Sequence, residues 1–290
     1  MRDLFDLSRY FARIGYDGPV EPTLDVLCRL HLLHPQAIPF ENLTPYTGGR
    51  VDLDLDAIAD KLVGHRRGGY CFEQNKLFHA VLTRIGFRVS PLIARVLWRQ
   101  PRDARAAQSH MLLRVDLGGD AWFVDVGFGS ATQTMPLRHV LNEAQEARHG
   151  VFRLVESGVA GELESEFGTP DGWRTMYRFA LRPVEWIDYD VANWFTSTYP
   201  ASIFLNELIV CRVLPDGRAN LVNETLTVRG LDGHARVERL TDATAWAACL
   251  REQFGLDLTG FDSAALFARA QARGDELAEA EARSAPVAHV

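Results

Sequence analysis

RRGGYCFEQNKLFHAVL, residues 66–82, places Cys71 directly after two glycines and at the start of a predicted helix. Two glycines permit a sharp turn and a close approach of neighbouring backbone. The positive end of the helix dipole, together with Arg66 and Arg67, favours the thiolate over the thiol. A buried cysteine without chemistry is the commoner case in proteins. Cys71 is therefore a candidate nucleophile with a structural alternative.

Apolar residues at helical spacing predict that this helix has one buried face and ends at Gly86. Upstream, the same spacing predicts helices over residues 4–14 and 23–34, and a third beginning near Asp54. From about residue 89 the pattern changes to short segments rich in β-branched and aromatic residues, which predict strands. These segments are LIARVLW, HMLLRVDL, AWFVDVGF, VFRLV, MYRFAL and LIVCRVL.

The C-terminal third combines a hairpin with further helices. Turn residues in LPDGRANL, residues 214–221, predict a hairpin. Helical patterns return after about residue 241, and residues 275–290 are expected to form a frayed helix or a tail. Helices, then antiparallel strands, then mixed structure predict an α+β chain of two or three packed sub-domains.

Composition excludes several classes of protein. The 290 residues carry 31 Lys plus Arg against 38 Asp plus Glu, a net charge of −7, which argues against nucleic-acid binding. Acidic residues near the N-terminus argue against a signal peptide. The sequence contains no run of about 18 apolar residues, so no membrane span is expected. The four cysteines lie far apart, so neither a disulfide framework nor a metal site is expected. We expect a cytoplasmic, reduced protein in which a catalytic thiol stays free.

A thiolate nucleophile needs a base and a group that orients the base. His110 opens the predicted strand HMLLRVDL, and Asp125 lies on the return strand AWFVDVGF. A connecting loop of even length puts the two side chains on the same face, directly opposite or one rung apart, whereas an odd loop separates them. The apolar neighbours of Asp125 imply burial, and a buried carboxylate needs a partner such as an imidazole. A purely structural His–Asp pair that holds the hairpin is the alternative.

Cys71, His110 and Asp125 together would form the thiol version of a Ser–His–Asp triad, with a nucleophile, a base and an orienting acid. The same triad serves thiol hydrolases and transglutaminase-like enzymes. What separates these classes is whether an amine or water opens the thioester. A non-catalytic binding module would require an inert Cys71.

Four segments resemble the arylamine N-acetyltransferase family. RGGYCFEQN, residues 67–75, is similar to its active-site signature, and HPQAIPFENL, residues 34–43, to its upstream motif. DVGFG, residues 125–129, resembles the segment that holds its triad aspartate, and NWFTSTYPASIF, residues 193–204, its later substrate-pocket segment. The resemblance covers roughly residues 1–212. It implies a helical bundle over 1–87, a β-barrel over 88–200 and an α/β lid over 201–290, with the triad at their junction.

The resemblance also implies a reaction. An acetyl group passes from acetyl-CoA, through a thioester on Cys71, to an aromatic amine or hydrazine in a ping-pong mechanism. His110 and Asp125 complete the triad, and no tightly bound cofactor is expected. An amide synthase that acts on a larger aromatic metabolite would use the same thioester chemistry. The physiological amine, the preferred acyl chain and the oligomeric state, a homo-oligomer included, are left open.

Further site residues follow from the same motifs. Phe40, Phe128 and Phe204 resemble positions that line the family's aromatic pocket. Gly127 and Gly129 let backbone N–H groups face an anion, so these two glycines and Phe128 are candidates for contact with coenzyme A. A Gly-x-Gly pair is by itself more often only a turn.

The polar residues of the signature are expected to hold the turn. Glu73 and Asn75 are interpreted as scaffold residues with no part in the chemistry. Arg67 is expected to anchor Glu73 or an adjacent carbonyl group, and Arg66 to be a solvated charge.

Overall fold

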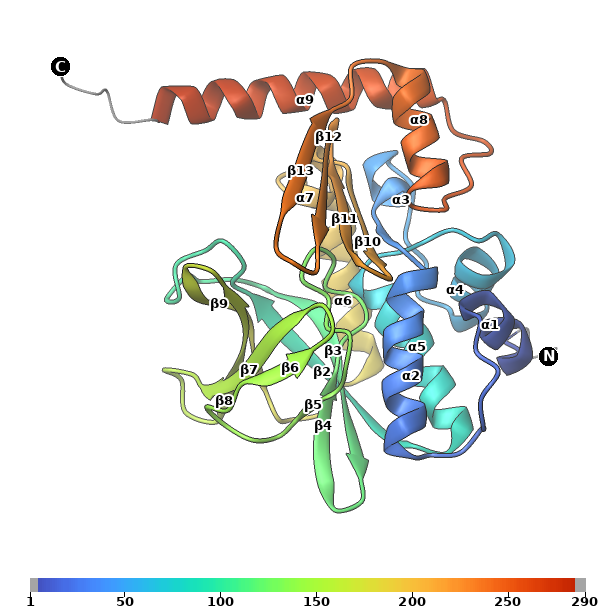
Figure 1. Cartoon of the computed structure of the whole chain (residues 1–290), viewed down its shortest axis with the longest axis vertical. Coiled ribbons are helices and arrows are strands. Elements are labelled where there is room, and N and C mark those ends of the chain that lie inside the picture. Colours follow the sequence, from blue (N-terminus) through green and yellow to red (C-terminus); the bar gives the residue numbers. More distant parts are fainter. Residues whose placement is uncertain (1–4, 285–290) are drawn as a thin grey trace.

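The computed structural model describes residues 5–284, and helices from its first 87 residues pack with the buried helix α5 in one apolar core (Figure 1). α5 buries one apolar face and ends at Gly86, whose positive φ of 105° suits glycine. The sequence predicted this helix and its stop. The helices of this part are α1 (Leu7–Ile14), α2 (Leu24–Ala37), α3 (Leu43–Tyr46), α4 (Leu55–Ala59), followed by one turn of π-helix (Asp60–Gly64), and α5 (Cys71–Ile85).

α2 continues past the end predicted for it. The sequence ended this helix at His34, before Pro35, but the helix includes Pro35 and runs to Ala37. A proline loses the hydrogen bond that its own N–H would make and crowds the carbonyl four residues before it, but it does not remove the N–H groups that follow. The next turn still closes, because the N–H of Ile38 donates to the carbonyl of His34 at 2.8 Å.

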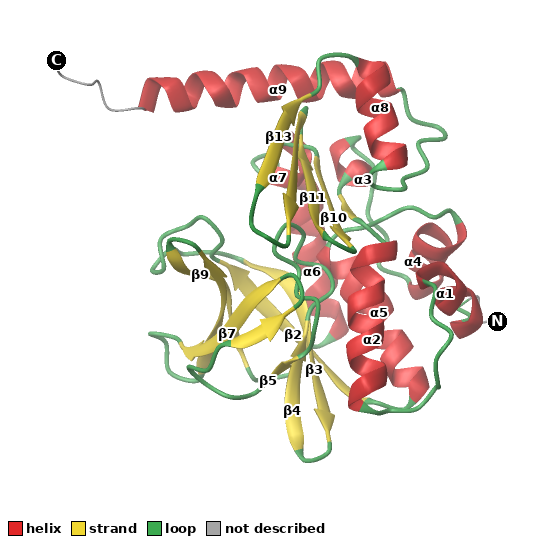
Figure 2. Cartoon of the chain, in the orientation of Figure 1, coloured by secondary structure: helices red, strands yellow, loops and turns green. Residues whose placement is uncertain are grey.

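An eight-stranded antiparallel sheet follows and curls into a nearly closed barrel (Figure 2). Its strand order is β5-β4-β3-β2-β9-β8-β7-β6, so neighbours in the chain are mostly neighbours in the sheet. Its core is built from Phe123, Phe152 and Tyr177 with their apolar neighbours. The strands are β2 (Arg88–Val96), β3 (Gln108–Leu117), β4 (Asp120–Val124), β5 (Leu137–Arg138), β6 (Gln145–Ala147), β7 (Gly150–Glu156), β8 (Glu162–Thr169) and β9 (Gly172–Ala180).

A second, five-stranded sheet has the order β1-β10-β11-β12-β13. Its first strand comes from the helical part of the chain, because Phe40 pairs with Cys211. Leu214 pairs with Gly217, which confirms the predicted hairpin turn. The strands are β1 (Phe40–Glu41), β10 (Ile209–Leu214), β11 (Gly217–Val222), β12 (Thr225–Gly230) and β13 (Ala235–Arg239). β1 thus ties the first predicted segment, 1–87, to the last.

Two C-terminal helices cover one face of this sheet through a core around Trp246 (Figure 1). They are α8 (Ala243–Glu252) and α9 (Ser263–Ser284). α9 is one continuous helix, so residues 275–284 are helical, and residues 285–290 of the expected tail lie outside the described residues. The longer of the two helices projects past the sheet edge in Figure 1.

Two helices lie between the two sheets in the chain, α6 (Trp186–Thr198) and α7 (Ile203–Asn206). The sequence pattern predicted no helix here, only a pocket segment over residues 193–204. α6 buries Tyr189, Asn193, Thr196 and Ser197, a set at helical spacing. Within residues 5–284, no helix is both long and apolar enough to cross a membrane.

Candidate active site

Cys71 is the first residue of α5 and is buried. Glycine is required at positions 68 and 69, because neighbouring atoms approach both residues too closely for a side chain. A Cβ on Gly68 would lie 2.2 Å from the carbonyl oxygen of Pro39, and one on Gly69 would lie 2.7 Å from Oε2 of Glu73. The thiol donates to the carbonyl of Ser109 at 3.6 Å, which places Sγ at the start of β3. The glycine pair thus presents Cys71 at the helix N-terminus against the barrel.

His110 and Asp125 meet as the even-loop register predicts. Leu117 pairs with Asp120 across the turn, and continuing that register leaves His110 and Asp125 one rung apart on one face. His110 Nε2 and Asp125 Oδ2 are 2.7 Å apart, and both side chains are buried. Because Nε2 is occupied, Nδ1 is the ring nitrogen left for the thiol of Cys71.

The electrostatics of the three residues favour charge separation. Burial lowers the pKa of His110, but the negative charge of Asp125, their hydrogen bond and the neighbouring Cys71 outweigh burial and raise that pKa to about 10. Burial raises the pKa of Asp125, but the charge and hydrogen bond of His110, with bonds from Asn75 and Gly127, lower it overall. The arrangement therefore holds an imidazolium beside the sulfur at neutral pH.

Asn75 was expected to be a scaffold residue, but in the structure it binds the carboxylate of Asp125 and orients it. Its Nδ2 donates to Asp125 Oδ1 at 3.0 Å and to the carbonyl of Met111 at 2.6 Å. Its Oδ1 accepts the N–H of Val126 at 3.1 Å. The helical spacing was the available signal, because residue 75 lies one turn after residue 71 on the same face.

The partner expected for Arg67 was wrong. Arg67 Nη2 lies 2.6 Å from Glu41 Oε1, whereas Glu73 pairs with Lys61 at 2.7 Å. Glu73 also accepts the N–H of Tyr70 at 3.1 Å, which caps α5. Glu41 and Glu73 are therefore each paired with a different cation. Arg67 links the signature segment to Glu41 on β1.

The three predicted pocket phenylalanines fall into two groups. Phe40 and Phe204 pack together, with ring centroids 6.0 Å apart, and Tyr70 lies 5.5 Å from Phe204. Phe128 instead lies 5.4 Å from His110 and 5.5 Å from Tyr177. One aromatic group thus includes Tyr70, the residue before Cys71, and the other contacts the His110 imidazole; contact of either group with a substrate stays a prediction.

Neither glycine of the 127–129 segment has a free amide. The N–H of Gly127 donates to Asp125 Oδ1 at 2.9 Å, and that of Gly129 to Thr132 Oγ1 at 2.7 Å. A Cβ on Gly127 would lie 3.0 Å from the Cα of Cys71. These glycines hold the loop against α5, so the argument that their amides face an anion fails. Contact of the segment, Phe128 included, with coenzyme A through other atoms stays a prediction.

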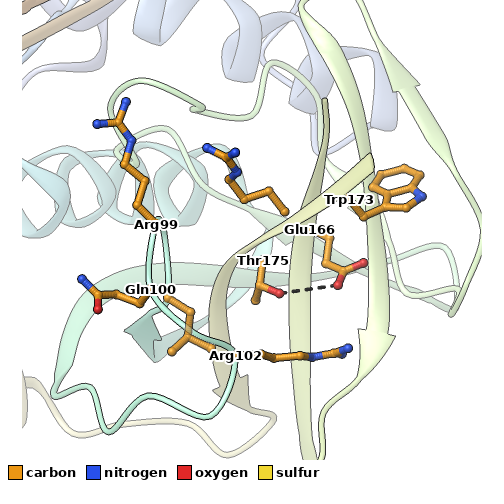
Figure 3. A pocket seen from close by; sticks show the side chains of 8 residues that line it. Arg99, Gln100, Arg102, Glu166, Trp173 and Thr175 are labelled. Carbon is orange, nitrogen blue, oxygen red and sulfur yellow. Dashed lines mark hydrogen bonds between the residues drawn. The ribbon is translucent and has the colours of Figure 1, made fainter. Parts of the chain in front are cut away.

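Two of the cavities in the described part of the chain are formed by the barrel and by α6. One, of about 490 Å³, opens on the barrel and brings together Arg99, Arg102, Arg174 and Glu166, of which Glu166 bonds Thr175 (Figure 3). The other, of about 800 Å³, runs between α6 and the start of β3, one residue from Ser109. Neither is lined by a triad residue. Among residues 5–284 no cluster of three His, Cys, Asp or Glu side chains could hold a metal ion.

Known proteins are similar to this chain in sequence and in architecture. A family model described as N-acetyltransferase matches residues 23–263, which extends the similarity beyond the motifs into α8 and the sheet next to it. The arylamine N-acetyltransferase of Mycobacterium tuberculosis is 43% identical over 257 residues, 87% of this chain and 90% of the relative. That of Escherichia coli is 41% identical over 252 residues, 86% of this chain and 88% of the relative.

Two solved structures give the same result. The Mycobacterium tuberculosis enzyme superposes with a TM-score of 0.86 at 41% identity, covering 91% of this chain and 99% of the other. The Mycobacterium marinum enzyme, solved in complex with CoA, gives a TM-score of 0.87 at 39% identity and covers 91% and 98%.

Proposed function

This chain belongs to the arylamine N-acetyltransferase family, and from that premise we propose that it transfers acetyl groups from acetyl-CoA to aromatic amines or hydrazines by a ping-pong mechanism through a thioester on Cys71. Acetyl-CoA is the co-substrate, in keeping with the CoA complex of the Mycobacterium marinum relative. In this proposal the helical segment 1–87 supplies the nucleophile, the barrel segment 88–200 supplies the base and the orienting acid, and the segment 201–290 closes over them.

In the first half-reaction the sulfur of Cys71 attacks the carbonyl carbon of acetyl-CoA. A new carbon–sulfur bond forms, the bond to coenzyme A breaks, and the departing thiolate takes a proton from the His110 imidazolium. The raised pKa of His110 supports this step, because the proton is held beside the sulfur at neutral pH.

In the second half-reaction the amine nitrogen attacks the acetyl carbon. His110 accepts the proton that the nitrogen loses, Asp125 stabilises the resulting imidazolium, and the sulfur of Cys71 leaves. An aniline nitrogen is neutral at pH 7, whereas an aliphatic amine with a pKa near ~10.4 must first lose a proton. The aromatic rings of Phe40, Phe204 and Phe128 favour a flat apolar acceptor.

The single observation that carries the proposal is the 2.7 Å contact of His110 Nε2 with Asp125 Oδ2, next to a cysteine at a helix N-terminus. A thiol hydrolase could use the same three residues, and so could an amide synthase for larger aromatic metabolites. Nothing in the described residues favours either of these over the acetyltransferase.

The test compares steady-state acetyl transfer to an aniline and an aryl hydrazine with transfer to lysine and a polyamine at saturating acetyl-CoA. We expect the aromatic acceptors to be faster. Equal rates with the aliphatic amines would reject the arylamine assignment. Release of free acetate as fast as any amine is acetylated would identify a hydrolase instead.

A further inference from the structure

Helix α2 lies beside α5 and carries two fully buried histidines, His31 and His34 (Figure 1). The two are three residues apart, so they share one face of the helix. The ring of Phe78 on α5 packs against both, with its centroid 6.0 Å from that of His31 and 5.3 Å from that of His34. The proposed reaction uses neither imidazole. Buried polar side chains are accounted for by their hydrogen bonds, so the partners of these two rings indicate what they hold.

The hydrogen bonds of His34 lead to the glycine turn that precedes the nucleophile. Nε2 of Gln74 lies 2.8 Å from the carbonyl oxygen of Pro39 and 3.2 Å from that of Gly69, which identifies this end of the side chain as the amide nitrogen. Its Oε1 therefore accepts a hydrogen bond from Nε2 of His34 at 2.7 Å. The proton of the imidazole is thus on Nε2, and Nδ1 accepts from the Tyr10 hydroxyl at 2.8 Å. Burial lowers the pKa of His34 to about 3, which keeps this chain of bonds intact at neutral pH.

Gln74 restrains a turn that is flexible by composition. Gly68 and Gly69 have more conformational freedom to lose than other residues, so the turn needs partners that fix its geometry. The carbonyl of Gly69 accepts the N–H of Glu41 at 3.0 Å and the amide of Gln74 at 3.2 Å. Gln74 lies in the first turn of α5, three residues after Cys71. Its amide therefore ties the glycine turn directly to the helix that carries the sulfur.

His31 holds the other half of the site. Its Nε2 lies 3.0 Å from the main-chain carbonyl oxygen of Asp125, which can only accept, so Nε2 carries the proton here as well. The bond fixes the backbone of the residue whose carboxylate binds His110. Nδ1 of His31 is buried and has no hydrogen-bond partner in the part of the chain that the structure describes. In both histidines it is therefore Nε2 that connects α2 to the active site.

We propose that His31 and His34 are positioning residues of the active site. His31 acts through the backbone of Asp125. His34 acts through Gln74 on the turn that precedes Cys71. Because both rings project from one helix, α2 fixes the acid and the nucleophile relative to each other. The proposal rests on the proposed function, in which these two groups belong to one triad.

The two ring nitrogens can be tested separately. By its length, a glutamine side chain places its amide nitrogen near the position of histidine Nε2, and an asparagine places it near that of Nδ1. His34→Gln can therefore still donate to Gln74, whereas His34→Asn cannot. A displacement of about 1 Å can cost about 10²-fold in rate, so we expect His34→Asn to slow acetylation about 10–100-fold without raising KM for acetyl-CoA. His34→Gln should keep most of the wild-type rate.

The same contrast applies to His31. His31→Gln retains a donor for the carbonyl of Asp125 and should keep most of the acetylation rate, whereas His31→Asn loses that donor and should be slow. His79→Asn is the matched control, because His79 is a partly buried histidine of α5 that packs on Trp186, with ring centroids 4.9 Å apart. It should leave the rate unchanged. Thermal melting of every variant separates a loss of rate from a loss of folded protein.

Alkylation of Cys71 by iodoacetamide at pH 6 separates this proposal from the proposed function, because it needs no acetyl-CoA. We expect alkylation to be slow in His34→Asn and close to the wild type in His34→Gln. Gln74→Met is a second route to the same test, since it keeps the length of the side chain and removes the amide, and it should also be slow.

Equal rates in the asparagine and glutamine variants, whether both are retained or both are lost, would overturn the proposal. Wild-type alkylation of a folded Gln74→Met protein would do the same. A wild-type chain that is alkylated at Cys71 but never acetylated would reject the proposed function instead, and the alkylation rates of the variants would still decide whether α2 positions the thiol.

Discussion

Replacement of Asp125 by asparagine isolates the contribution of the carboxylate to the site. The asparagine oxygen can still accept from Asn75 and from the N–H of Gly127, so the loop is retained. Its amide, however, donates to His110 Nε2 where the carboxylate accepted. The change therefore removes the negative charge and imposes the other tautomer on the imidazole.

Two other buried histidines give the magnitude. Neither His31 nor His34 has a carboxylate side chain as a hydrogen-bond partner, and burial lowers their pKa values to about 4 and about 3. The pKa of His110, which is equally buried, is instead raised to about 10 by the charge of Asp125, their hydrogen bond and the neighbouring Cys71. In a Ser–His–Asp triad the same substitution lowers kcat about 10⁴-fold.

We expect Asp125→Asn to fold and to lose about 10³–10⁴-fold in the rate of acetylation at pH 7. The direct assay is the rate of alkylation of Cys71 by iodoacetamide as a function of pH. In the wild type this rate should remain high at pH 6, because the imidazolium is retained up to about pH 10. In the variant it should be low at pH 6 and rise toward alkaline pH.

Asp120→Asn is the matched control, because Asp120 lies on the same hairpin and pairs with Arg138 at the surface. It should leave the alkylation profile unchanged. Circular dichroism confirms the fold of both variants. If Asp125→Asn and the wild type show the same alkylation profile, the assigned His110–Asp125 pairing does not govern the thiol and the reasoning fails.

Three further predictions concern stability. Gly127→Ala should lower the free energy of unfolding by about 1–3 kcal/mol and slow acetylation, because its Cβ would lie 3.0 Å from the Cα of Cys71 at the start of α5. An unchanged melting temperature together with an unchanged acetylation rate would contradict the close packing. Arg67→Ala should cost about 3–5 kcal/mol in urea unfolding, because it leaves the fully buried Glu41 without its cation, and a cost under 1 kcal/mol would refute the pairing. Burial keeps His31 and His34 neutral in the folded state, so their stabilisation is full above the unfolded pKa of ~6.5 and is lost as pH falls toward 4. Each of these two histidines should lower the free energy of unfolding by roughly 2 kcal/mol at pH 5 relative to pH 7. Urea midpoints that do not change between pH 7 and pH 5 would contradict the prediction.

The parts of the fold that depend on local patterns could be predicted from the sequence. The buried face of α5 and its glycine stop follow from helical periodicity, and the hairpin at residues 215–216 follows from its turn residues. The His110–Asp125 contact needed only one further condition, an even register across the turn at 118–119. These features are set by residues close together in sequence.

The parts that were missed depend on partners far apart in the chain. β8 was not predicted as a strand, because Glu164 and Glu166 make its sequence look polar. Both glutamates are buried, and the arginines that pair with them, Arg102 and Arg153, come from other segments. α6 escaped detection because its exposed face carries Ile187, Val191 and Trp194 while its buried face is mostly polar, which reverses the usual amphipathic pattern.

The polar contacts of the site divide in the same way. Arg67 was expected to anchor Glu73 or an adjacent carbonyl group, but Glu41 and Lys61, which lie farther away in the sequence, complete the actual pairs. The role of Asn75 depends on Met111 and Val126, which only the packing of α5 against the barrel brings within reach.

The thioester on Cys71 is the central claim, and the intact mass of the protein after incubation with acetyl-CoA in the absence of amine tests it most directly. We expect a single acetyl adduct, mapped by peptide analysis to Cys71, absent from Cys71→Ser and discharged on addition of an aniline. Acetylation of Cys28, Cys211 or Cys249 in place of Cys71 would contradict the claim. Unmodified protein together with accumulating free coenzyme A would contradict a thioester that waits for an amine.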